Sequence, residues 1–153
     1  MKMPVPAMLL GAMGAFPFST LAGMVVTGIK VPGIDNGFAL MSYGAIVLSL
    51  MGGVHWGLAM LTPGHGAGGR WGTQSEWRTY GASLVPAFFA WTALLIPVKA
   101  GAWLMAAAFA GLLVYDLRCV RLGEAPSWFP SLRWPLSIMA AGSLIVGVAL
   151  ARG

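Results

Sequence analysis

The fold is decided by the stretch Tyr43-Gly-Ala-Ile-Val-Leu-Ser-Leu-Met-Gly-Gly-Val-His-Trp-Gly57. It lies inside a run, residues 37 to 60, that contains no Asp, Glu, Lys or Arg. As a helix this run would be about 36 Å long, and the hydrocarbon core of a bilayer is about 30 Å thick. The stretch therefore predicts a membrane span, and the histidine retained inside it marks a candidate functional site.

The composition extends this prediction to the whole chain. Of the 153 residues, 58% are hydrophobic and only 8% are charged, whereas soluble domains are about 25% charged. The length suits one domain. We therefore expect an all-α integral membrane bundle of five transmembrane helices, a single domain over residues 1–153, with spans at about 4–28, 37–61, 79–98, 100–117 and 132–151.

The basic residues predict an orientation. With five spans, one side of the membrane would hold Lys2, Arg70, Arg78, Arg118, Arg121 and Arg133, and the other Lys30, Lys99 and Arg152. The richer side is expected to be cytoplasmic. This predicts a multi-pass protein of the bacterial inner membrane with a cytoplasmic N-terminus and a periplasmic C-terminus. Scattered basic residues next to spans indicate contact with the lipid bilayer and anionic lipid, not with nucleic acid.

Most polar groups near the spans gather at one edge in this topology. Span 2 ends shortly after His55 and Trp56, span 3 begins at Tyr80, span 4 ends near Tyr115 and Asp116, and span 5 begins at Arg133. Antiparallel neighbours bring these ends to the same depth. We therefore expect a polar cluster, a candidate ligand-binding site, at the cytoplasmic edge, made of His55, Trp56, Tyr80, Tyr115, Asp116 and Arg133.

Asp116 needs a partner if it lies close to hydrocarbon. The candidates are Arg133 and Arg118, with His55 as a third, because pairing lowers the free-energy cost of a charge near lipid. The favoured interpretation is a structural ion pair between spans 4 and 5. The alternative is a role in handling a substrate, a proton or a ligand.

His55 has three interpretations, in decreasing order of preference. It forms a structural hydrogen bond, it binds a proton or a ligand, or it ligates a metal in a haem or a chlorophyll-type pigment. The pattern Gly53-Val-His-Trp-Gly57 is a GxxxG motif, which lets helices approach closely. We expect Gly53 and Gly57 to pack span 2 against span 4, and so to bring His55 near Tyr115 and Asp116. No metal site is predicted.

Several short motifs together resemble a known family. It is the bacterial and mitochondrial membrane family of unknown function that includes human transmembrane protein sixty-nine. The resemblance runs from Ser42 to Leu136 and implies a small multi-span protein, without implying an activity. Its pieces are Tyr43-Gly-Ala, Leu48-Ser, Gly52-Gly-Val-His-Trp-Gly57, Tyr80, Ser83-Leu-Val-Pro86, Trp91, Tyr115-Asp116, Ala125-Pro-Ser-Trp128 and Leu132-Arg133.

The expected function is not enzymatic, because the sequence has no phosphate loop, no HExxH and no nucleophile elbow. The first hypothesis is an accessory or assembly subunit of a larger energy-transducing complex, respiratory or photosynthetic, with other membrane subunits as partners. The second is a binder or carrier of a quinone, lipid, pigment or proton that uses the polar cluster. A third and weaker one is a membrane enzyme with His55 and Asp116 as an acid–base pair.

Overall fold

The computed structural model describes residues 3–61, 74–123 and 125–149. Within these ranges every regular element is a helix, which confirms the all-α prediction. The elements are α1 (Val5–Thr27), α2 (Asn36–Leu61), α3 (Gln74–Leu95), α4 (Val98–Arg121), α5 (Phe129–Leu144) and the π-helix η1 (Ile145–Ala149), which continues α5.

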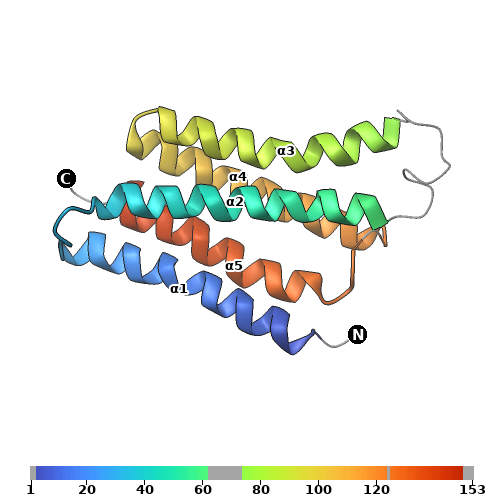
Figure 1. Cartoon of the computed structure of the whole chain (residues 1–153), viewed down its shortest axis with the longest axis horizontal. Coiled ribbons are helices and arrows are strands. Elements are labelled where there is room, and N and C mark those ends of the chain that lie inside the picture. The colour runs from blue at the N-terminus through green and yellow to red at the C-terminus, as the bar shows by residue number, and fades with distance from the viewer. Residues whose placement is uncertain (1–2, 62–73, 124, 150–153) are drawn as a thin grey trace.

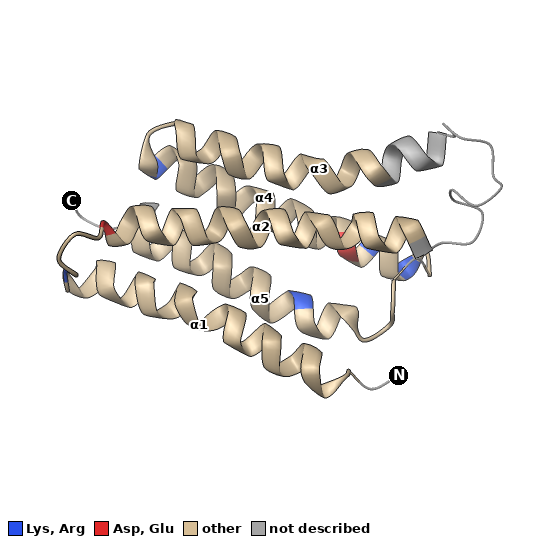
Figure 2. Ribbon diagram, viewed as in Figure 1, with Lys and Arg blue, Asp and Glu red and all other residues tan. Residues whose placement is uncertain are grey.

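Within the part of the chain that the structure describes, four helices are long and apolar enough to cross a bilayer. They are Val5–Thr27, Asn36–Met60, Val98–Arg121 and Phe129–Val148. In α3 only the shorter segment Tyr80–Leu95 is apolar. In the ribbon of Figure 2, most of the described helical residues are neither acidic nor basic. The chain is therefore a helical membrane bundle with four spans of full length and a fifth helix packed among them.

The five helices lie roughly antiparallel, each beside the next along the chain (Figure 1). Contacts join α1 to α2, α2 to α3, α3 to α4, α4 to α5, and α5 back to α1. Helix α2 also contacts α4 across this ring. The closed order places α2, α4 and α5 side by side, so residues from all three can meet in the interior.

The interior is filled by large apolar side chains from four of the helices. Phe18 of α1, Leu48 of α2, Phe109 of α4 and Leu144 of α5 are all fully buried. The Phe18 and Phe109 rings meet edge to face at 6.2 Å between centroids. Many other large apolar side chains point outward, as expected where lipid, rather than water, is the solvent.

The predicted boundary of the fourth span needs correction. We expected 100–117 to be the shortest span, but α4 runs for 24 residues, whereas the span that α5 forms with η1, Phe129–Val148, has 20. The expected bounds followed the uncharged residues between Lys99 and Asp116. Helix α4 starts directly after Pro97 and continues past Asp116, because the carboxylate is buried among partners and does not have to reach water.

Candidate functional site

One face of α2 carries the interior contacts, and His55 belongs to it. The buried positions of this helix follow helical spacing: Leu48, Met51, Gly52, His55 and Ala59. Only 2% of the His55 surface is exposed. The imidazole is thus fixed in the interior, about 9 Å of helix before the end of α2 at Leu61.

Asp116 of α4 is the centre of the polar cluster. His55 Nε2 lies 2.5 Å from Asp116 Oδ1, and since a carboxylate can only accept, the imidazole donates through Nε2–H. Arg133 Nε of α5 donates to the second carboxylate oxygen, Oδ2. One buried carboxylate therefore joins three helices, and both of its oxygens are used.

Arg133 completes the cluster from α5 and is itself 2% exposed. Its guanidinium carbon lies 5.4 Å from the centre of the Phe129 ring, one helical turn earlier, a cation–π arrangement. Among the described residues its Nη2 has no hydrogen-bond partner. Sequence reasoning did not identify Phe129, although its place four residues before Arg133 on one helix was a usable signal.

The opposite charges of Asp116 and Arg133 cancel within this cluster. Burying either ion alone would be very unfavourable, whereas the paired and hydrogen-bonded group is tolerated. Of the candidates from sequence, Arg133 and His55 are both partners, while Arg118 is exposed. Arg118 follows Asp116 by two residues on the same helix and so points away from it.

The remaining predicted cluster residues divide into two groups. Tyr115 contacts His55 edge to face, with 4.9 Å between ring centroids. Trp56 and Tyr80 contact each other instead, at 5.2 Å between centroids, and Trp56 is 38% exposed. The structure therefore brings together His55, Tyr115, Asp116 and Arg133, and places the Trp56–Tyr80 pair towards the surface.

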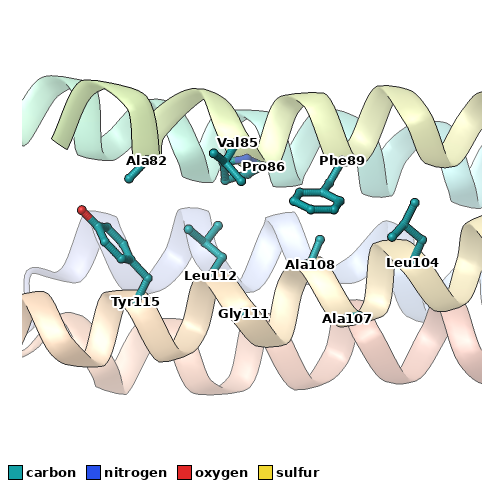
Figure 3. A pocket seen from close by; sticks show the side chains of 10 residues that line it. All are labelled: Ala82, Val85, Pro86, Phe89, Leu104, Ala107, Ala108, Gly111, Leu112 and Tyr115. Atoms are coloured by element: carbon teal, nitrogen blue, oxygen red, sulfur yellow. The ribbon is translucent and has the colours of Figure 1, made fainter. Parts of the chain in front are cut away.

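A cavity of about 360 Å³ lies between α3 and α4, next to this cluster. Tyr115 stands at one end with its hydroxyl turned towards Ala82, as Figure 3 shows. The other lining residues are apolar: Ala82, Val85, Pro86, Phe89, Leu104, Ala107, Ala108, Gly111 and Leu112. Sequence reasoning missed this cavity, because small residues on α4 leave the space only once α3 lies opposite them.

The predicted packing role of Gly53 and Gly57 is wrong. Both glycines are exposed, and an added Cβ would meet nothing within 4 Å among the described residues. Each is two residues from His55 and therefore on the opposite side of α2. The close approach occurs at Gly52, where a Cβ would lie 2.5 Å from the Ser83 carbonyl oxygen of α3.

The described residues hold no group of three or more His, Cys, Asp and Glu side chains placed to bind a metal ion. In the cluster, His55 Nε2 is engaged by Asp116. The second histidine, His65, lies outside the described residues, as do the basic residues Lys2, Arg70 and Arg152 that entered the orientation count.

This all-helical bundle, with its apolar outer surface, defines a multi-pass membrane protein. The chain belongs to the family described as "Protein of unknown function (DUF3429)", whose model matches residues 3–149. The family membership confirms the resemblance found in the short motifs.

Two relatives carry the name Transmembrane protein 69. The chain is 38% identical to the one from Xenopus tropicalis over 145 residues, which is 93% of this chain and 53% of that protein. It is 24% identical to the one from Mus musculus over 148 residues, 96% of this chain and 57% of that protein. The chain spans about half the length of these relatives. No solved structure matches it.

Proposed function

We propose that the protein binds a small, mostly apolar molecule with a hydrogen-bonding head, of the quinone type, in the cavity between α3 and α4. The observation that carries the proposal is the position of Tyr115. This residue lines one end of the cavity, and its ring contacts His55, which donates to Asp116. The cavity and the buried cluster are therefore connected through one side chain.

The chemistry of the lining favours a quinone. A quinone ring and its isoprenoid tail are apolar and suit the alanine, leucine and phenylalanine surface. Its carbonyl oxygen can accept a hydrogen bond from the phenol of Tyr115. The volume of about 360 Å³ lies at the lower end of ligand sites, about 300–1,000 Å³, and suits a head group with the start of a tail. The proposed role is binding or carriage, without a catalytic step.

The test is a titration of the detergent-solubilised protein with a short-tailed ubiquinone analogue. Quenching of the tryptophan fluorescence of the protein reports binding. Gly111→Leu places a side chain in the cavity and should weaken binding at least tenfold. Tyr115→Phe removes one hydrogen bond, worth about 1 kcal/mol, and should weaken binding about fivefold. Both variants keep the helix backbone unchanged.

Gly23→Leu is the matched control for partition of the quinone into the micelle. Gly23 is exposed on α1 and does not line the cavity, and no atom of the described residues lies within 4 Å of an added Cβ. The control should bind as the original chain does. Equal quenching in all four proteins would refute the proposal.

The proposed topology has all five helices crossing a bacterial inner membrane, with a cytoplasmic N-terminus and a periplasmic C-terminus. It is supported by the antiparallel ring and by the exposed Arg118 and Arg121 near the end of α4 that lies towards the polar cluster. That end would face the cytoplasm. Labelling of single cysteines added at each terminus by a membrane-impermeant reagent tests it, and labelling of both termini from one side would contradict it.

A second candidate function is that of an accessory subunit in an energy-transducing complex, and the lipid-facing glycines of α2 favour it. Gly53 and Gly57 are exposed and leave open space beside the helix backbone. A helix of another subunit could approach closely there. The two functions are compatible, since this face lies on α2 and the cavity lies between α3 and α4.

Gentle extraction from native membranes tests the second candidate. The original chain should migrate within one defined larger complex, and Gly53→Leu should release it as a monomer while Gly23→Leu does not. Recovery of the original chain as a monodisperse monomer would contradict the accessory role.

A further inference from the structure

The connection between α1 and α2, at the opposite end of the bundle from the polar cluster, is a fixed piece of backbone. Helix α1 ends at Gly28 in a left-handed conformation, with φ at 72°. A turn follows in which the Ile34 N–H donates to the Val31 carbonyl at 3.1 Å. Asn36 Nδ2 then reaches back to the Ile29 carbonyl at 2.6 Å. These bonds all lie within the connection and its two flanking helices.

This connection borders a second cavity, of about 420 Å³, that is open on one side. Three of its lining residues are polar or charged: Lys30, Asp35 and Asn36. The others are small or apolar: Met24, Val25, Gly28, Ile29, Ile34 and Gly37. A cation, an anion and an amide therefore share one cavity with hydrocarbon side chains, which is unlike the almost wholly apolar cavity between α3 and α4.

Asn36 gives this cavity a specific requirement. The residue is only 9% exposed, and its Oδ1 is buried with no hydrogen-bond partner among the described residues. A buried amide oxygen in this state is unfavourable and calls for a donor. The neighbouring Asp35 is an anion that uses one oxygen, Oδ1, to accept the Phe38 N–H at 2.9 Å. An ammonium group, with several N–H donors and a positive charge, matches both residues.

Lys30 supplies the opposite charge, and the surroundings of the cavity are those of a lipid surface. Ile29, Ile34 and Phe38 are all more than half exposed beside it. An anionic phosphate would sit with Lys30, and acyl chains would cover the apolar side chains. We infer that this cavity binds the head group of an aminophospholipid, with the ammonium at Asp35 and Asn36 and the phosphate at Lys30. The site is independent of the cavity between α3 and α4.

Native mass spectrometry of the delipidated protein tests the assignment by titration with two lipids of identical acyl chains. Phosphatidylethanolamine carries N–H donors, whereas the methyl groups of phosphatidylcholine replace all of them. We expect phosphatidylethanolamine to bind about tenfold more tightly, the value of one lost hydrogen bond to a charged group. Equal binding of the two lipids would overturn the proposal.

Variants of the lining residues identify the side chains that cause the preference for phosphatidylethanolamine. Asn36→Leu and Asp35→Ala should each reduce the ratio of the two affinities to below about twofold, and Asp35→Ala covers the case in which Asn36→Leu does not fold. Lys30→Gln should weaken both lipids and keep their ratio. Arg121→Gln, an exposed cation near the far end of α4, should change nothing. A preference that survives both Asn36→Leu and Asp35→Ala would place the site elsewhere.

Soluble phosphoethanolamine separates a lipid from a free metabolite of the same chemistry. A lipid site needs the acyl chains, so phosphoethanolamine at a hundredfold excess should leave the bound phosphatidylethanolamine in place. Displacement at equal concentration would assign the cavity to a soluble ligand and overturn the lipid assignment.

Discussion

The two ends of the bundle handle polar side chains in different ways. At one end Asp116 is 1% exposed and shares its two oxygens between His55 and Arg133. At the other end Asp35 is exposed, and the only contact described for its side chain is the Phe38 N–H at the start of α2. The comparison teaches that a carboxylate stabilises this bundle through partners on other helices at one end, and through its own helix at the other.

Replacing each carboxylate by an amide gives the largest expected difference between the ends. Asp116→Asn leaves the Arg133 charge buried without a counter-ion and should destabilise the protein by about 3–5 kcal/mol. Asp35→Asn keeps a good capping residue at an exposed site and should change stability by less than about 0.5 kcal/mol. Unfolding by SDS in mixed micelles measures both. Similar losses at the two sites would break the comparison.

The next effect concerns the imidazole of the buried end. His55→Phe keeps a ring against Tyr115 but removes the donor to Asp116 Oδ1, and should destabilise the protein by about 1–3 kcal/mol. The loss should be smaller than that of Asp116→Asn, because Arg133 still neutralises the carboxylate. Thermal denaturation of the two variants side by side checks this order, and the reverse order would make His55 the centre of the cluster.

A smaller effect separates two adjacent glycines near the buried end. Gly52→Ala pushes a methyl group against the Ser83 carbonyl of α3 and should destabilise by about 1–2 kcal/mol. Gly53→Ala meets open space and should be neutral or stabilising by about 0.5–1 kcal/mol, since alanine favours helix. Denaturation experiments measure both changes in stability. Equal effects would mean that α2 is rotated about its axis relative to the orientation described above.

The sequence predicted the helices and the meeting of α2, α4 and α5 at the polar cluster, because charge-free runs and their order along the chain determine both. It did not decide between Arg133 and Arg118 as the partner of Asp116, and it assigned the close packing to Gly53 and Gly57. Both questions depend on the rotation of a helix about its axis. For α2 the burial of His55 determines this rotation. When His55 faces the interior, Gly52 also faces inward, and Gly53 and Gly57 face outward.

The two cavities show where sequence reasoning ends. The cavity between α3 and α4 exists because Ala107, Ala108 and Gly111 lie opposite another helix, and a run of small residues alone predicts tight packing equally well. The cavity at the α1–α2 connection depends on the turn geometry around Gly28 and Asn36. Neither shape follows from composition or periodicity.

The central claim is that Asp116 and Arg133 act as one buried unit holding α4 to α5. A double-mutant cycle of Asp116→Asn and Arg133→Gln tests it most directly, with the free energy of unfolding of each variant measured in SDS. The account predicts that the double variant is more stable than the sum of the single losses implies, with a coupling of at least about 2 kcal/mol. Losses that add to within about 0.5 kcal/mol would contradict it, because they would mean that the two side chains do not interact.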